Sequence, residues 1–268
     1  MIARVNTAPR RVLVTGAASG LGWALAQAFA VAGDELVLVD RNREQLQARM
    51  RQLPAGARAV VLDLTDSVSV TNWAADFCLR EQRLDVLVNN AGITHRSPVT
   101  ATRPEVLRQV MEVDYHAVVT LTLALYPALA AAQGTVVNIG SMAGWMPVMG
   151  RAAYCAAKGA LHQFFETFRA EVAPAGVRVL MVYPSFLDTP IEQHALGADG
   201  RPARHARSTV GRIMSAEAMA ARILGALAQG EERLFPDRFS FWASLLYRLW
   251  PTRYQQLMQQ RFADERGA

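Results

Sequence analysis

Short apolar runs alternate along this chain with longer segments in which apolar residues recur at helical spacing. The short runs are rich in Val, Ile and Leu, which is typical of buried strands. We predict six of them, at 11–15, 35–40, 59–63, 86–89, 135–140 and 177–183, and a seventh near Leu234 and Phe235. Strands that alternate with helices predict a parallel sheet covered on both faces, which is a doubly wound α/β (Rossmann) fold.

The length favours one domain over two. A chain of 268 residues that is 51% apolar can bury one substantial core, and no repeat or linker divides it. Residues 1–268 are therefore predicted to form a single catalytic domain. Two parts are expected to vary around its core: a polar substrate loop at 187–209, interpreted as a lid, and an aromatic-rich extension at 236–268.

A glycine-rich turn follows the first predicted strand, at the edge of the sheet where ligands bind in such folds. It has the pattern Gly-x-x-x-Gly-x-Gly, formed by Gly16, Gly20 and Gly22 with Ser19 and Leu21 between them. Such a turn lets backbone N–H groups approach a pyrophosphate at the start of a helix. Its place between a strand and a helix favours nucleotide binding over a purely structural turn.

Acidic residues end the next two predicted strands. A carboxylate at Asp40 can accept hydrogen bonds from ribose hydroxyls and would repel a 2′-phosphate, which favours NAD(H). Arg41 could instead meet that phosphate, so NADP(H) stays open. Asp63, followed by Leu64, could accept a hydrogen bond from the adenine amino group or cap the next helix.

The only lysine of the chain, Lys158, stands four residues after Tyr154. That spacing places both side chains on one face of a helix. A tyrosine that acts as acid and base near neutrality needs a nearby positive charge to lower its pKa. A compact ammonium suits this task and can also reach a ribose hydroxyl, whereas arginine is a wide fork.

Taken in order, these motifs make the chain resemble the short-chain dehydrogenase/reductases. The resemblance covers roughly residues 10–232 and rests on the glycine turn, Asn89-Asn90-Ala91-Gly92, Ser141, Tyr154 with Lys158, and Pro184 followed by Thr189. It implies a seven-stranded parallel sheet in one domain and assembly into a homodimer or homotetramer. It also implies hydride transfer between a nicotinamide cofactor and a CH–OH group.

The resemblance assigns roles to these residues. Tyr154 would be the acid/base, Lys158 would hold the ribose and lower the tyrosine pKa, and Ser141 would hold the substrate oxygen. Thr189 would bind the nicotinamide carboxamide. The remaining cofactor-facing positions that it implies are Asn90, Ala91, Gly92 and Pro184.

Two positions depart from the family pattern. Asp114 stands where the family usually has an asparagine that helps to hold a water in a proton relay, and it could pair with Lys158 instead. We keep Asp114 as a catalytic candidate. Ser185 replaces a common glycine after the proline, which puts the geometry of that loop in question.

The expected substrate is a small molecule, a hydrophobic secondary alcohol or ketone of lipid-like, steroid-like or aromatic type. The segment 142–149 is rich in Met and contains Trp145, and Phe186 begins the variable segment after the sixth strand. The competing interpretation is that these side chains pack against the chain's own helices.

Two other functions are alternatives to that of an alcohol dehydrogenase or ketone reductase. A non-catalytic NAD(P)-binding regulator or sensor of the same fold is the main alternative, but the chain retains Tyr154, Lys158 and Ser141. A sugar-nucleotide epimerase or dehydratase would carry a different glycine turn and a larger carboxyl-terminal domain.

The carboxyl-terminal extension holds an aromatic run at 239–250 with arginines at 238 and 248, broken by Pro251. We interpret it as a cover for a partner subunit or for the substrate entrance. Peripheral contact with a membrane is the less favoured alternative.

Charge and cysteine content add no further ligand or partner to these predictions. The net charge is +5, but the arginines are scattered, so nucleic acid is not expected as a partner. Cys78 and Cys155 have neither metal-ligand nor disulfide spacing, and no metal is expected. The first residues lack the apolar core of a secretory signal, which favours the cytoplasm.

Overall fold

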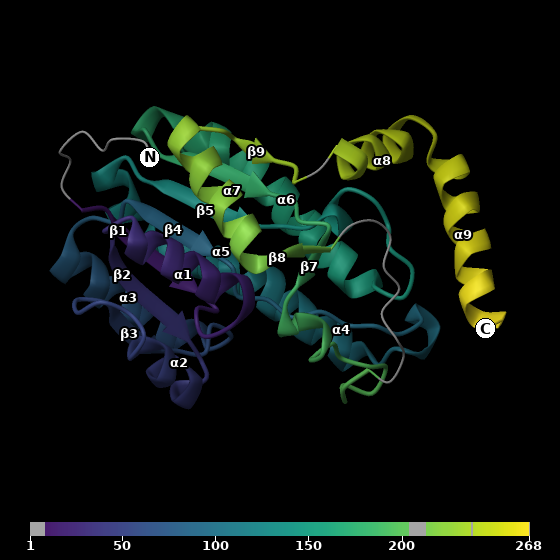
Figure 1. Cartoon of the computed structure of the whole chain (residues 1–268), viewed down its shortest axis with the longest axis horizontal. Coiled ribbons are helices and arrows are strands. Elements are labelled where there is room, and N and C mark those ends of the chain that lie inside the picture. The colour runs from purple at the N-terminus through teal and green to yellow at the C-terminus, as the bar shows by residue number, and fades with distance from the viewer. Residues whose placement is uncertain (1–8, 204–212, 237, 268) are drawn as a thin grey trace.

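A computed structural model describes residues 9–203, 213–236 and 238–267 of the chain. Its centre is a seven-stranded parallel sheet in the order β3-β2-β1-β4-β5-β6-β9 (Figure 1). The strands are β1 (Arg11–Thr15), β2 (Glu35–Asp40), β3 (Arg58–Val61), β4 (Val86–Asn89), β5 (Thr135–Ile139), β6 (Arg178–Val182) and β9 (Arg233–Leu234). A separate two-stranded parallel pair joins β7 (Phe186–Asp188) to β8 (Ile213–Ser215).

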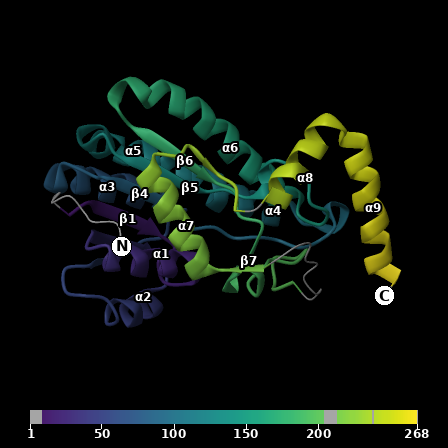
Figure 2. The same ribbon diagram turned by 45° about the horizontal axis from the view of Figure 1, so that its top comes forward.

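Helices cover both faces of the sheet, as Figures 1 and 2 show. One face carries α1 (Gly20–Val31) and α7 (Ala216–Gln229), which pack against each other, with α2 (Arg43–Met50) beside them. The other face carries α3 (Ser67–Glu81), α5 (Ala117–Ala132) and α6 (Ala152–Val172), while α4 (Pro104–Met111) leads into α5. The predicted doubly wound fold is confirmed.

Alternation along the strands divides the core between the two faces. In β1, Val12 and Val14 pack into the cluster that contains α1 and α7, whereas Leu13 packs into the cluster that contains α3, α5 and α6. All three side chains are fully buried. A parallel strand that is apolar on both sides therefore reads as a continuous hydrophobic run.

The strand boundaries agree closely with the sequence. β1, β2 and β4 have the predicted limits, while β3 spans 58–61 where 59–63 was expected. β5 ends one residue early, β6 is one residue shorter at each end, and the seventh strand is present at Arg233–Leu234. Asp63 thus lies beyond its strand, in the connection to α3.

The uncharged, apolar run that begins at Ala117 forms α5, which extends α4 through a π-helical turn at Glu112–His116. Among the described residues, the run Pro104–Ala132 is long and apolar enough to cross a membrane by length and composition alone. Leu121, Leu125 and Leu129 are nevertheless fully buried against the sheet and α3. This is the pattern of a core helix, which passes the same test.

Two helices form the carboxyl-terminal extension. α8 (Arg238–Leu249) and α9 (Pro251–Gly267) project from one end of the body (Figure 1). Pro251 separates them and occupies the first turn of α9, where a missing N–H costs nothing. The predicted lid at 187–209 is described only to residue 203. Within that part the chain forms β7 and a 3₁₀ helix, η5 (Pro190–Glu192).

Candidate active site

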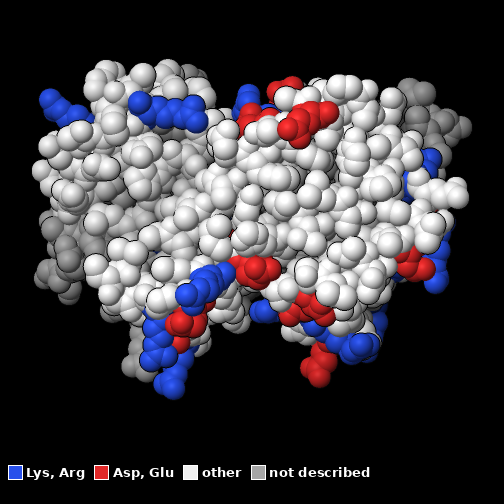
Figure 3. Space-filling view, turned by 180° about the vertical axis from the view of Figure 1, so that it is seen from behind, with Lys and Arg blue, Asp and Glu red and all other residues white. Residues whose placement is uncertain are grey.

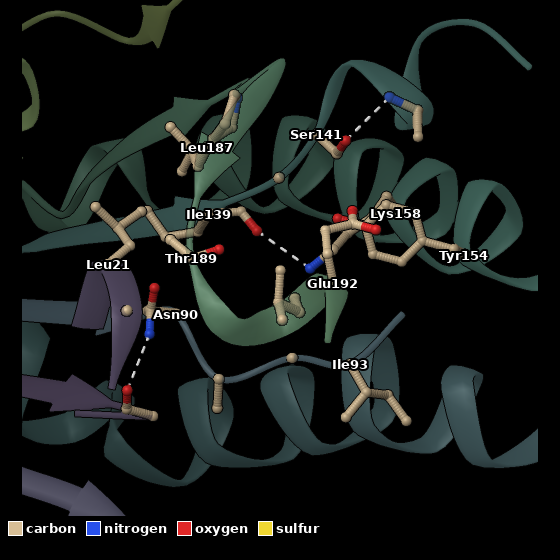
Figure 4. Close-up of a pocket in the computed structure, with 18 of the residues that line it drawn as sticks. Leu21, Asn90, Ile93, Ile139, Ser141, Tyr154, Lys158, Leu187, Thr189 and Glu192 are labelled. Carbon is tan, nitrogen blue, oxygen red and sulfur yellow. Dashed lines mark hydrogen bonds between the residues drawn. The ribbon is translucent and has the colours of Figure 1, made fainter. Parts of the chain in front are cut away.

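A large cavity lies at the carboxyl ends of the strands, next to the point where the strand order reverses between β1 and β4. Its volume is about 1260 Å³. Figure 4 shows its wall, to which Leu21, Asn90, Ser141, Tyr154 and Thr189 all contribute. The sequence motifs, which are far apart along the chain, therefore meet at one site.

The glycine turn closes on itself too tightly for side chains. A Cβ at Gly22 would lie 2.1 Å from the carbonyl oxygen of Gly16. Gly16 itself has a φ of +62°, and a Cβ there would lie 2.9 Å from the Cα of Ala91. The turn therefore requires glycine on steric grounds and leaves the start of α1 open to the cavity, as a pyrophosphate requires.

Hydrogen bonds join the glycine turn to the segment after β4. The hydroxyl of Thr15 accepts from the backbone N–H groups of Asn90 and Ala91 at 3.0 and 3.1 Å. The side-chain amide of Asn90 donates to the carbonyl of Thr15 at 2.9 Å. Asn89 points into the core and donates to Asn138 on the neighbouring strand at 2.9 Å. Asn90 thus holds the glycine turn beside the cavity, whereas Asn89 ties β4 to β5.

Asp40 is held rigidly at the end of β2. One carboxylate oxygen accepts from the N–H of Ala18 at 3.0 Å and the other from the N–H of Asn42 at 2.9 Å. Each oxygen keeps a further lone pair for a ribose hydroxyl. Arg41 is exposed and also lines the cavity. Both residues therefore line the cavity at the carboxyl end of β2.

Asp63 and Leu64 line the same end of the cavity. Asp63 accepts hydrogen bonds from the N–H and hydroxyl of Thr65 at 2.9 and 2.8 Å. The alternative that Asp63 caps the next helix is wrong, because Asp66 is the N-cap of α3 and accepts from the N–H of Ser69. Asp63 instead shapes the turn, and its placement agrees with the adenine interpretation.

Tyr154 and Lys158 lie on the first turns of α6, one turn apart, as predicted. The Lys158 ammonium lies 5.7 Å from the centre of the Tyr154 ring and donates to the carbonyl of Ile139 at 3.2 Å (Figure 4). Ser141 follows β5 and accepts from the N–H of Ala143 at 3.1 Å, which fixes its hydroxyl beside the cavity. These three residues form one wall of the site.

Asp114 is the fourth member of this group. It is fully buried, and its Oδ2 lies 3.3 Å from Nζ of Lys158. Its Oδ1 accepts from the N–H of Ile93 at 2.7 Å. The predicted pairing of Asp114 with Lys158 is therefore present, and the π-helical turn in the helix is what carries the carboxylate there.

The pKa shifts in this group correct the expectation that the pKa of Tyr154 is lowered. Burial raises the pKa of Tyr154, and this effect outweighs the lowering by Lys158, while Asp114 raises it further. Burial also raises the pKa of Asp114 against the opposing ammonium of Lys158. For Lys158, burial favours the neutral amine, but the charges of Asp114 and Tyr154 prevail and its pKa is raised. Lys158 thus lowers the tyrosine pKa as predicted, but the net shift is upward.

The segment after β6 approaches the glycine turn at the cavity. Pro184 and Thr189 both line the cavity, and a Cβ at Gly20 would lie 3.3 Å from the Cβ of Thr189. Thr189 thus sits directly over the turn. Ser185 is not among the described non-glycine residues with positive φ, so its side chain introduces no left-handed strain. The geometry of the loop does not require glycine there.

Each of the two interpretations of segment 142–149 holds for some of its residues. Met146 and Val148 line the cavity beside Phe186, as the substrate interpretation predicts. Trp145 does not. It packs against Tyr183 and Phe235 in the chain's own core, 5.1 and 5.5 Å between ring centres.

The sequence did not single out the α9 side chains that reach this cavity. Trp242 and Leu246 of α8 line it together with Tyr254, Leu257 and Met258 of α9. Tyr254 donates to the carbonyl of Pro147 at 3.1 Å and so fastens α9 to the segment after Ser141. Only the continuation of a helical pattern beyond Pro251 could have indicated α9. Among the described residues, no group of three or more His, Cys, Asp or Glu side chains could hold a metal ion.

Comparison with known proteins assigns the family. The family model described as short chain dehydrogenase matches residues 10–198. The chain is 35% identical to the bovine (Bos taurus) protein "Dehydrogenase/reductase SDR family member 7B" over 267 residues, covering 95% of this chain and 82% of that protein. The mouse (Mus musculus) protein of the same name is 38% identical over 197 residues, covering 70% of this chain and 61% of that protein.

Solved structures agree. A short-chain dehydrogenase from Streptomyces avermitilis superposes with a TM-score of 0.80 at 32% identity, covering 96% of this chain and 98% of that one. One from Burkholderia cenocepacia, in complex with NADP, gives 0.79 at 25% identity, covering 93% and 97%. The chain belongs to the short-chain dehydrogenase/reductase family. Its class of activity is NAD(P)-dependent oxidoreduction.

Proposed function

We propose that this protein interconverts hydrophobic secondary alcohols and ketones with NAD(H) as the preferred cofactor. The observation that carries the proposal is one cavity in which the glycine turn and Asp40 form one end and Ser141, Tyr154 and Lys158 form another. An apolar wall from α8 and α9 completes it. The backbone of the glycine turn, which Gly16, Ser19, Gly20 and Leu21 present to the cavity, fits the pyrophosphate of a dinucleotide.

In this proposal each polar group has one task. The bound nicotinamide supplies or accepts the hydride. Ser141 holds the substrate oxygen, and Tyr154 gives it a proton during reduction and takes it back during oxidation. Lys158 stabilises the phenolate and holds the ribose. The raised pKa of Tyr154 keeps the proton on the phenol, which is the form that donates it to a ketone oxygen.

The preference for NAD(H) rests on Asp40. Its carboxylate is fixed by two backbone N–H groups, so it cannot swing away from a 2′-phosphate. The Burkholderia relative was solved in complex with NADP, so the fold by itself does not exclude NADP(H). The choice therefore depends on local residues, and here a fixed negative charge faces the ribose.

The substrate class rests on the side chains around Tyr154. Met146, Val148 and Phe186 from the body face Leu246 and Met258 from the carboxyl-terminal helices. Such a surface gains free energy from apolar contacts and offers few groups that could bind a polar sugar. An apolar alcohol or ketone is the chemistry that this wall fits.

We also propose a homodimer or homotetramer. Figure 3 shows the face opposite α1 and α7, where a broad area without charged side chains separates groups of interleaved Arg and acidic residues. Large exposed side chains on that side of the sheet include Leu123 of α5, which is 51% exposed. An uncharged surface with exposed apolar side chains such as Leu123 is typical of subunit contacts.

Replacement of Tyr154 tests the proposed mechanism. The wild type is screened with hydrophobic secondary alcohols and ketones by the absorbance of NADH, and Tyr154→Phe is assayed with the best substrate. Loss of the proton donor should lower kcat by roughly 10²- to 10⁴-fold. NADH binding, followed by fluorescence titration, should persist.

Two outcomes would contradict the proposal. Full turnover by Tyr154→Phe would exclude the tyrosine as acid/base. Tight binding of NADH by the wild type without turnover of any compound in the screen would favour the alternative, a cofactor-binding regulator or sensor.

A further inference from the structure

A cluster of three charged residues lies beside the cavity and takes no part in the mechanism above. We call it the Glu192 clamp; it consists of Glu192, Arg151 and Arg96. The Nη2 of Arg151 contacts both carboxylate oxygens of Glu192, at 2.9 and 2.7 Å. The Nη2 of Arg96 contacts the same carboxylate at 2.5 Å. The three side chains are only 13–16% exposed.

The clamp joins three segments that each carry part of the predicted chemistry. Arg96 follows β4 and the cofactor-facing Asn90–Gly92 turn. Arg151 is the N-cap residue of α6, three positions before Tyr154. Glu192 ends η5, three positions after Thr189 (Figure 4). The clamp thus connects the segment after β4, the helix that carries Tyr154 and the segment that carries Thr189.

Further bonds show that the connection is built into the fold. Arg151 also donates to the hydroxyl of Thr94 at 3.0 Å. The backbone N–H of Leu196 donates to the carbonyl of Thr94 at 2.9 Å, and the N–H of Arg96 donates to the carbonyl of Leu196 at 2.7 Å. The segment that follows Glu192 is therefore fastened to the segment after β4 by backbone hydrogen bonds as well.

The sequence distance between Glu192 and Thr189 is short, and Pro190 restricts the backbone between them. Thr189 in turn lies over the glycine turn, with its Cβ 3.3 Å from the position of a Cβ on Gly20. A displacement of Glu192 would therefore be passed to Thr189. Hydride transfer depends steeply on such positions, because a misplacement of about 1 Å can cost roughly a hundredfold in rate.

We propose that Arg151 and Glu192 are positioning residues that fix Thr189, and with it the nicotinamide, against Tyr154. This inference rests on the proposed function. It adds a determinant of geometry that neither the motifs nor the family assignment supplies. The ion pair acts only on the nicotinamide end of the cofactor, because the adenosine end is held by the glycine turn and Asp40.

Arg151 has a second influence on the same reaction. Its positive charge is among the groups that lower the pKa of Tyr154, in opposition to burial. Removal of this charge should therefore shift the pH profile of oxidation to higher pH. A residue that merely stabilised the loop would not produce such a shift.

The experiment compares the two ends of the cofactor. Glu192→Gln keeps the shape of the side chain but removes its charge, and the affinities for NADH and for ADP-ribose, which lacks the nicotinamide, are measured by titration. The clamp predicts that NADH affinity and kcat each fall roughly tenfold. The affinity for ADP-ribose should stay unchanged.

Glu166→Gln is the matched control. Glu166 is likewise bound to two arginines, Arg169 and Arg233, but it lies on the far part of α6 and does not line the cavity. Its replacement should leave both affinities and kcat unchanged. If Glu192→Gln does not fold, Arg151→Lys keeps the charge, loses the bidentate contact and should give the same selective loss.

Two results would overturn the clamp. One is NADH affinity and kcat equal to those of the wild type in the variant that folds. The other is an equal loss of NADH and ADP-ribose affinity, which would show general loosening of the site. If the wild type itself binds no NADH, the proposed function fails as well. Normal NADH binding by the wild type together with either of the two results above would overturn the clamp alone.

Discussion

The carboxylate at Asp114 is the residue that most alters the expected chemistry. The family pattern has an asparagine there, whereas this chain places a buried acid 3.3 Å from the lysine ammonium. The acid draws on the same positive charge that would otherwise stabilise the phenolate of Tyr154. A single change from amide to carboxylate thus opposes the function of Lys158.

Asp114→Asn tests this electrostatic competition. Removal of the negative charge should favour the phenolate and lower the pKa of Tyr154, because Asp114 raises it. Oxidation requires the phenolate, so its rate should reach a plateau at lower pH than in the wild type. The measurement is the pH profile of kcat for alcohol oxidation. Asp199→Asn, which changes an exposed acid away from Tyr154, should leave the profile in place, and an upward shift in Asp114→Asn would contradict the argument.

Asp40 offers a test of cofactor choice. Asp40→Ser removes the charge that would repel a 2′-phosphate, while Arg41 stays in place to attract it. The ratio of kcat/KM for NADPH to that for NADH should rise by at least about tenfold, since 1.4 kcal/mol of electrostatic repulsion corresponds to that factor. Steady-state kinetics with both cofactors provide the measurement. A wild type that already prefers NADPH would show that the interpretation of Asp40 is wrong.

At the scale of elements, the strands and the glycine turn were predictable because their signals are local. A buried parallel strand is a continuous apolar run, and the turn needs glycine wherever a Cβ would strike backbone, as at Gly22. The net pKa of Tyr154 was not predictable. It depends on burial and on Asp114, which lies forty residues away in the chain and reaches the site through a π-helical turn.

The carboxyl-terminal helices could be predicted only in part. Their aromatic content suggested a cover for the substrate entrance, and the structure places Trp242 and Leu246 in the cavity wall. The contribution of α9 was missed, because the sequence between Thr252 and Gln260 has weak apolar periodicity. Contacts such as that between Tyr254 and Pro147 arise from tertiary folding and leave no local pattern.

Replacement of a side chain in this wall by a smaller one should weaken the binding of long substrates and leave the binding of short substrates unchanged. Leu246→Ala should raise KM for a long apolar ketone by roughly 10-fold or more, since one methylene is worth about 1–3 kcal/mol in a fitted pocket. KM for a short ketone and the affinity for NADH should not change. Leu249→Ala on the same helix is the control, because Leu249 is exposed and does not line the cavity. Equal effects of the two variants on KM for the long ketone would show that Leu246 of α8 does not contact the substrate.

At the scale of the whole molecule, charge is distributed in pairs. Arg80 with Asp76 and Arg58 with Glu81 are examples on α3 and its neighbours. The net charge of +5 therefore does not gather into one basic surface on the face in Figure 3. Pairing leaves the uncharged area between these groups as the feature most suited to contact with another protein surface.

Assembly through that area predicts a mass of two or four times 29.3 kDa in solution, measured by size-exclusion chromatography with light scattering. Leu123→Glu should shift the protein towards the monomer, because an unpaired carboxylate would be buried at the contact. Val31→Glu changes an apolar residue of α1 that is 91% exposed and lies on the other face of the sheet, and it should leave the mass unchanged. A monomeric wild type would show that the uncharged face does not hold subunits together. Dissociation by Val31→Glu instead would place the contact on the side of α1.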